Sequence, residues 1–228
     1  MKYFILCILL LQTSFLYSEE NIAAAPEKSN SSLENRKKHN YGLNAIFAPI
    51  DVLVYGKYGL SFYKATEEKN TQYELQYLKA SYAVSIANID FAKMTDQRLS
   101  FFKRNFSDSG NFNWYYGLSY ISFDASFGSN VLNNLVPGSN LSEAELVKIQ
   151  TIGFDFGLGH RWYFDNNMSL SVDWFGVSQP LAILKKEAPY AEAASTSDTD
   201  KSNAKSAVDI ITFFPRLQAL KLSLGYNF

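Results

Sequence analysis

An alternation of apolar with small or charged residues is the feature that most constrains how this chain can fold. In residues 152–164, the even positions other than His160 are apolar, and the odd positions are glycine, aspartate, arginine or tyrosine. Because successive side chains of a β-strand point to opposite faces of a sheet, this period of two predicts a strand with one apolar face. Residues 168–174 repeat the pattern after a short turn at residues 165–167, so the two segments are predicted to form a β-hairpin.

The same period of two recurs from Tyr41 onward and predicts an all-β fold. Apolar residues alternate with small or charged ones in residues 58–62 and 78–84. In a later segment the apolar phase slips by one position at Ile121 and Phe123, which indicates a β-bulge. The pattern predicts eight strands, at residues 41–48, 52–65, 72–86, 96–106, 112–127, 149–164, 168–181 and 208–228.

Alternation alone is also compatible with a soluble β-sandwich or a lipocalin-like barrel, whose apolar face points inward. The second face of the predicted strands favours a membrane barrel instead. Its glycine, serine and scattered charged residues suit a narrow polar lumen, and aromatic residues at the segment ends suit girdles at the membrane interfaces. After residue 18, no run of 18 or more apolar residues occurs that could form a spanning helix. We therefore predict a closed antiparallel transmembrane β-barrel.

Charged residues at inward positions of the predicted barrel form a candidate lumen network. Its members are Lys57, Lys79, Asp155, Arg161, Asp173 and Lys221. A turn centred on Asn166 places Asp173 opposite Gly159 and diagonal to Arg161. Unpaired charges in a narrow lumen cost several kcal/mol each, so these side chains are expected to pair and to block the lumen.

The last segment of the sequence alternates apolar residues with small or polar ones and ends on an aromatic residue. Its outward residues are Leu220, Leu222, Leu224, Tyr226 and Phe228. This pattern resembles that of bacterial outer-membrane β-barrel proteins, whose final strand has such an ending and is recognised by the barrel-assembly machinery. By length, the resemblance is to small eight-stranded barrels of the OmpA and OmpX type, over residues 41–228. The five outward residues are therefore predicted to be an assembly signal.

The resemblance implies residence in the bacterial outer membrane, with both chain ends in the periplasm. The implied partners are outer-membrane lipids, lipopolysaccharide and the barrel-assembly machinery. Turns at the periplasmic end are then short, and the long connections at residues 128–148 and 182–207 lie outside the cell. The connection at residues 49–51 is short for an external loop, so residues 41–65 could instead form one broken strand.

Residues 1–18 are predicted to be a secretory signal peptide, because Lys2 precedes an apolar run and small and polar residues follow it. A membrane helix and a lipoprotein anchor at Cys7 are the alternatives. Residues 19–40 are polar and lack periodicity, which predicts a flexible periplasmic segment ahead of the barrel. The basic cluster at residues 36–39 is expected to be solvated, with contact to anionic lipid headgroups as the alternative.

The composition excludes several kinds of chemistry. Twenty-one Lys and Arg residues against 22 Asp and Glu residues give a net charge of -1, so nucleic-acid binding is not expected. One Cys and two His residues are too few for a zinc site or a disulfide framework. No catalytic residue, cofactor or metal site is predicted. His160 is interpreted as an interfacial residue rather than an acid–base group, because no serine partner lies nearby in the sequence.

These observations favour an integral outer-membrane barrel with a structural or interaction role, in adhesion or envelope integrity. Its surface loops are expected to meet lipopolysaccharide or a host or other extracellular ligand, because strands satisfy their own backbone and leave loops free for recognition. Three alternatives stay open at this point: a small-solute channel, a lipid A-modifying barrel enzyme and a soluble periplasmic β-barrel.

Overall fold

The structure is a computed structural model. It describes residues 31–51, 54–86, 89–108, 110–128, 143–188, 206 and 208–228. The predicted signal peptide lies outside the described residues, as does the first part of the predicted periplasmic segment. Residues 129–142 and 189–205, which make up most of the two long connections, also lie outside them.

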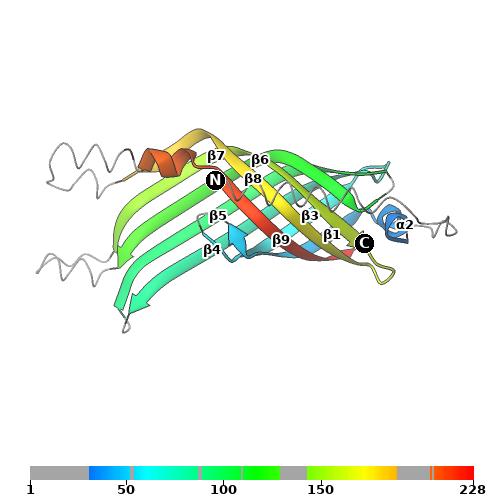
Figure 1. The fold of residues 1–228 in the computed structure, drawn as a ribbon, viewed down its shortest axis with the longest axis horizontal. Helices are drawn as coiled ribbons and strands as arrows, with labels where there is room; N and C mark the ends of the chain where they lie inside the picture. The colour runs from blue at the N-terminus through cyan, green and yellow to red at the C-terminus, as the bar shows by residue number, and fades with distance from the viewer. Residues whose placement is uncertain are drawn as a thin grey trace, which may run out of the picture. The chain divides into compact units, whose positions relative to one another are not determined.

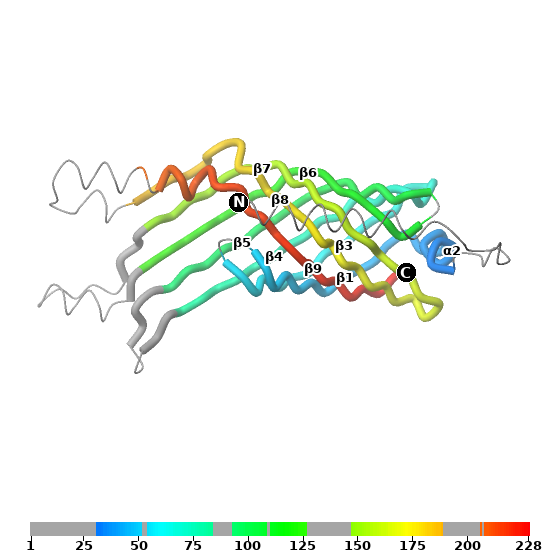
Figure 2. The backbone as a smooth tube through the Cα atoms, viewed as in Figure 1, coloured from blue at the N-terminus to red at the C-terminus, as the bar shows by residue number. Residues whose placement is uncertain are grey.

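The described residues form one closed β-sheet (Figure 1). Its elements are α2 (Ser31–Lys38), β1 (Tyr41–Ala48), β2 (Ile50–Asp51), β3 (Lys57–Ala65), β4 (Thr71–Ile86), β5 (Ile89–Phe106), β6 (Phe112–Gly128), β7 (Glu143–Tyr163), β8 (Met168–Glu187) and β9 (Arg216–Asn227). Neighbouring strands are antiparallel in the order β1-β3-β4-β5-β6-β7-β8-β9, and β9 also pairs with β1, which closes the sheet (Figure 2). Because β2 continues the line of β1 along β9, eight of the described strands surround the lumen. The prediction of an all-β, closed antiparallel barrel of eight strands is confirmed.

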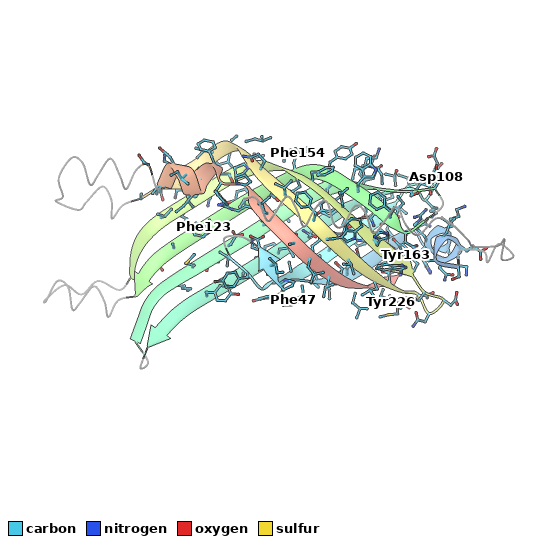
Figure 3. All side chains as sticks on the ribbon, in the orientation of Figure 1. Phe47, Asp108, Phe123, Phe154, Tyr163 and Tyr226 are labelled. Carbon is cyan, nitrogen blue, oxygen red and sulfur yellow. The ribbon has the colours of Figure 1, made fainter. Side chains whose placement is uncertain are left out.

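Apolar side chains cover the outside of the barrel wall (Figure 3). Leu60, Leu118 and Leu224 are 53 to 57% exposed, at positions that the alternation assigns to the apolar face. Ser61 and Ser119, which alternate with them, are 2% exposed and point into the barrel. Since the closed sheet leaves no protein to cover the outer face, lipid tails are the medium that this face fits.

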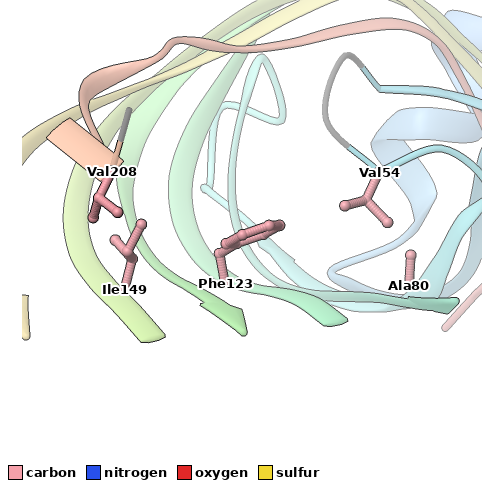
Figure 4. Close-up of a cluster of buried hydrophobic side chains, with 5 residues drawn as sticks. All are labelled: Val54, Ala80, Phe123, Ile149 and Val208. Atoms are coloured by element: carbon pink, nitrogen blue, oxygen red, sulfur yellow. The ribbon is translucent and has the colours of Figure 1, made fainter. Parts of the chain in front are cut away.

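Toward the end of the barrel that bears the long connections, the inner face of the wall becomes apolar and the outer face becomes more polar. There Ala80 of β4, Phe123 of β6 and Ile149 of β7 point inward and are buried. They form an apolar cluster with Val54, from the connection between β2 and β3, and with Val208 (Figure 4). An apolar cluster therefore covers the lumen at this end of the barrel.

This exchange, and not a bulge, explains the phase slip in β6. Ile121 and Phe123 are buried at 1 and 4% exposure, and β6 stays in register with β5 through both of them. The irregularity of β6 lies farther along, against β7, between Ala125 and Ser126. The bulge predicted at residues 121–123 is therefore wrong, because apolar side chains point inward where the lumen is apolar.

The first hairpin consists of two separate strands, because β1 and β3 pair along their lengths. The alternative of one broken strand is therefore wrong. The second strand begins at Lys57, later than predicted, because the preceding residues turn into the lumen and bury Asp51 and Val54. Gly56 closes this turn with a φ of 67°, a conformation open to glycine at no steric cost, and its N–H donates to the Pro49 carbonyl at 3.1 Å.

Several strands are longer than predicted at the same end. β5 begins at Ile89, β7 begins at Glu143 and β8 continues to Glu187. The first long connection is correspondingly shorter than residues 128–148, whereas the second begins later than residue 182 and ends later than residue 207. Figure 1 shows β4 to β7 continuing beyond the point where β9 begins, so one side of the wall is taller than the other.

The last strand is shorter than predicted, because residues 208–213 are helical and β9 begins only at Arg216. Val208 and Thr212, one helical turn apart, are both buried, and the Thr212 hydroxyl donates to the Val208 carbonyl at 2.6 Å. Pro215 follows the helix, where a proline disfavours further helical turns. This segment therefore forms a helix and not a strand, with Val208 and Thr212 buried and Ile210 and Phe213 exposed.

Helix α2 corrects the prediction that residues 19–40 are flexible throughout. Ser32 donates to Asn111 at 2.7 Å, and Asn35 donates to Asp165 at 2.8 Å. Arg36, expected to be solvated, is 1% exposed, and its guanidinium lies 4.4 Å from the centre of the Phe106 ring. These contacts hold the helix on the short turns of the barrel. No apolar periodicity marks this helix in the sequence, because it is attached through polar side chains and not through an apolar stripe.

No helix in the described ranges is long and apolar enough to cross a membrane.

Candidate functional site: an ion-pair network in the lumen

Five charged residues near the short turns form what we call the turn-side cluster, namely Glu74, Arg104, Arg161, Asp173 and Lys221. Arg104 donates to both carboxylate oxygens of Asp173, at 2.9 and 3.0 Å, and to Glu74 at 3.1 Å. Arg161 donates to the same Glu74 oxygen at 3.0 Å. The Lys221 ammonium lies 2.9 Å from Asp173. The cluster thus ties together five strands, β4, β5, β7, β8 and β9, across the lumen.

A second group, the loop-side cluster, lies toward the long connections and consists of Asp51, Lys57, Asp96, Arg98 and Arg216. The Lys57 ammonium lies 2.9 Å from Asp51 and 3.0 Å from Asp96. Arg98 donates to Asp51 at 3.2 Å, and Arg216 lies 4.0 Å from Asp96. The short strand β2, which pairs with β9, supplies Asp51 and so completes the cluster.

Little space remains between the two clusters. Asp155 accepts a hydrogen bond from Ser119 at 2.8 Å and lines a space of about 10 Å³ together with Arg98 and Gln218. That volume holds no more than about one water molecule. The Tyr115 ring fills the lumen beside it, 4.8 Å from the Arg104 guanidinium. The two clusters and Asp155 together contain nearly equal numbers of cationic and carboxylate side chains. Such a balance lets ion pairing offset the free-energy cost of removing these charges from water.

The structure places five of the six predicted lumen charges inside the barrel: Lys57, Asp155, Arg161, Asp173 and Lys221. Asp173 lies opposite Gly159, as the turn register predicts, but its cationic partners are Arg104 and Lys221. Arg161 pairs instead with Glu74, because closure of the barrel brings β4 across the lumen from β7.

Lys79 does not belong to the lumen, which corrects the prediction. Its neighbours Leu78 and Ala80 are buried at 0 and 1% exposure, so they hold the inward positions of β4. Lys79 therefore points outward. The prediction failed because it assumed one apolar face along the whole strand, whereas the faces exchange character near this point.

The predicted assembly-signal residues all lie on the outer face of β9 or directly after it. Leu220, Leu222, Leu224, Tyr226 and Phe228 are 37 to 58% exposed. Leu220 has a φ of 61°, and its neighbour Ala219 is also exposed, so the alternation of β9 changes phase at this residue.

The sequence analysis missed six of the ten residues in the two clusters, namely Asp51, Glu74, Asp96, Arg98, Arg104 and Arg216. A usable signal was present, because Asp96, Arg98 and Arg104 share one parity on β5 with the buried Phe102. Among the described residues, no group of three or more His, Cys, Asp or Glu side chains is arranged to hold a metal ion.

Aromatic rings surround the outside of the barrel near the short turns. The His160 ring lies 5.1 Å from Trp174 and 5.6 Å from Trp162, and its Nδ1 accepts a hydrogen bond from the Trp174 indole at 3.2 Å. On the neighbouring strands of the wall, Tyr41 at the start of β1 stacks on Phe228, which follows β9, at 6.1 Å. Amphipathic rings in this position are typical of the girdle at a membrane interface, which supports the interfacial interpretation of His160.

A closed eight-stranded sheet with an apolar outer belt, aromatic girdle residues and a polar lumen is the architecture of one class of membrane protein. The fold is that of a transmembrane β-barrel. No family model and no curated protein matches the sequence.

Several solved structures have a similar fold. The N-terminal β-barrel domain of Pseudomonas aeruginosa OprF is 13% identical, with 83% of this chain and 98% of that chain covered and a TM-score of 0.40. Acinetobacter baumannii CarO is 12% identical, with 84% and 99% covered and a TM-score of 0.45. A major outer membrane protein from Thermus thermophilus is 14% identical, with 83% and 98% covered and a TM-score of 0.47.

Proposed function

We propose that this barrel is a non-conducting structural and interaction protein of the outer membrane, which contributes to envelope integrity or adhesion. The observation that carries the proposal is the filled lumen. Two ion-pair clusters occupy it, and the space between Arg98, Asp155 and Gln218 is only about 10 Å³. A solute channel needs a continuous aqueous path, and cations held by buried carboxylates do not leave one without breaking ion pairs that cost several kcal/mol each.

Both ends of the lumen support the same proposal. Helix α2 covers the end with the short turns through Ser32, Asn35 and Arg36. At the other end, Val54 and Val208 cover the lumen as part of the apolar cluster. A helix alone could serve as a removable gate, but here ion pairs also fill the lumen beneath the helix.

The proposed partners are outer-membrane lipids on the apolar belt, lipopolysaccharide, and the barrel-assembly machinery, for which β9 offers a row of outward apolar residues. A host or other extracellular ligand is proposed to meet residues 129–142 or 189–205. Both connections join strands at the same end of the barrel, which supports this assignment, because a rigid wall can present such connections away from the membrane.

Planar-bilayer recording tests the non-conducting assignment. The purified barrel should give no stable unitary steps, whereas a porin in the same bilayers shows that the recording detects them. A variant that lacks residues 31–38 separates a filled lumen from a gated one. We expect this variant to be silent too, because the ion-pair clusters stay in place. Stable steps from either protein would overturn the proposal, and steps from the variant alone would identify α2 as a gate.

A further inference from the structure

The outer face of β4 to β7 changes abruptly from apolar to polar toward the long connections. Cross-strand pairing aligns Tyr77, Leu99, Tyr120 and Ile152 in one outward row. The next row, two residues farther along each strand, contains Lys79, Gln97, Ser122 and Gln150. Two residues of a strand cover about 6.6 Å, so the apolar belt ends within one row.

A groove lies in this polar surface. Its volume is about 390 Å³, and its lining includes Lys79, Lys93, Lys148 and Asp124. Thr95 and Asp124 are directly paired across β5 and β6, and Asp124 is paired with Lys148 across β6 and β7. Among the described lining residues, three ammonium groups and one carboxylate lie on a rigid four-stranded wall, which gives this part of the groove a net positive charge.

The position of the groove decides which anion it meets. The row with Tyr77 and Tyr120 places a phenol on each side of Leu99, and the Tyr77 hydroxyl donates to Gln97 at 3.3 Å, in the first polar row. Tyrosines with the ring on apolar surface and the hydroxyl on a polar group mark the membrane interface. The groove begins directly beyond that level, where the headgroups of the outer leaflet lie.

We infer that this groove binds the phosphate groups of a phosphorylated glycolipid in the outer leaflet. Lysine ammonium groups bind phosphate as point charges, and the three on β4, β5 and β7 can meet two phosphates of one lipid. The hydroxyls of Ser81 and Thr95, 3.0 Å apart, add neutral donors to the groove. The inference rests on the proposed position in the outer membrane and gives the barrel a specific lipid ligand there.

Native mass spectrometry of the full-length protein in detergent tests the inference with diphosphorylated lipid A as the probe. The groove variant carries Lys79→Gln, Lys93→Gln and Lys148→Gln. Its matched control carries Lys37→Gln, Lys64→Gln and Lys103→Gln, which change the net charge equally at sites outside the groove. We expect the groove variant to bind lipid A at least about tenfold more weakly than the wild type, because charge-assisted hydrogen bonds to phosphate are lost. The control should stay within about twofold.

Two further probes identify the source of the phosphate. Dephosphorylated lipid A should bind at least about tenfold more weakly to the wild type, and inorganic phosphate should not displace lipid A at equal concentration. Wild-type affinity in the groove variant would overturn the inference, as would an equal loss in the control. Equally tight binding of inorganic phosphate would show a free-anion site and not a lipid site. None of these results changes the conductance expected of the barrel, so the two proposals fail separately.

Discussion

Arg104 offers the sharpest test of the lumen network, because one side chain joins two carboxylates. It makes hydrogen bonds of 2.9 and 3.0 Å to Asp173 and one of 3.1 Å to Glu74, and it is 0% exposed. Replacing one partner of a buried ion pair typically costs about 3 to 5 kcal/mol, since the remaining charge is left unpaired. Asp173 keeps Lys221, and Glu74 keeps Arg161. We therefore expect Arg104→Met to lower the free energy of unfolding by about 3 kcal/mol, the low end of that range.

Urea unfolding in lipid vesicles measures this change. The three tryptophans, Trp114, Trp162 and Trp174, lie on outward positions, so their fluorescence reports departure of the wall from lipid. The matched control is Lys103→Met, which removes a cation from the adjacent outward position of β5 and should change stability by no more than about 0.5 kcal/mol. A loss below about 1 kcal/mol in Arg104→Met would refute the reasoning, because only solvated or unpaired charges are lost so cheaply.

A second substitution separates pairing from packing. Asp173→Leu alone leaves Arg104 and Lys221 with fewer carboxylates, so it should destabilise the barrel strongly. Added to Arg104→Met, it should cost less than it does alone, because Arg104, one of the two cations that pair with Asp173, is already absent. A double-mutant cycle measures this coupling. Strict additivity of the two losses would show that the side chains do not interact.

Three further changes probe other parts of the molecule. Gly157→Ala should destabilise the barrel by about 1 to 3 kcal/mol in the same urea assay, because its Cβ would lie 2.3 Å from the Tyr115 ring. Arg36→Ala should leave the barrel folded but expose residues 31–38 to protease, since it removes the hydrogen bonds to Gly110 and Asn70; unchanged digestion would show that other contacts hold the helix. Deleting residues 189–205, which spares β8, should preserve the heat-dependent gel mobility of a folded barrel and abolish any surface adhesion; retained adhesion would move the binding site elsewhere.

The sequence by itself determined the fold class and most of the wall. A period of two is a local property of extended backbone, so it identifies strands and their faces wherever lipid covers one side and polar groups the other. The hairpin around Asn166 and the burial of Arg161, Asp173 and Lys221 follow from the same rule, because a short turn fixes the register of the strands beside it.

Local alternation could not show where the medium on each side of the wall changes. Beyond the apolar belt, water or headgroups replace lipid outside, and the apolar cluster replaces the ion pairs inside. Along one strand, apolar side chains therefore point outward within the belt and inward beyond it. For this reason Lys79 was assigned to the lumen, and the phase slip at Ile121 and Phe123 was interpreted as a bulge. The polar groove outside β4 to β7 was missed for the same reason.

Only the tertiary structure decided which charges pair. Glu74 and Arg161 lie 87 residues apart in the sequence, yet their side chains form a 3.0 Å hydrogen bond across the lumen. That contact depends on the number of strands, their register and the closure of β9 on β1, which together set how far apart opposite walls stand. The helix over the short turns depends on the same closure, since Ser32, Asn35 and Arg36 find their partners on turns that meet only when the barrel is complete.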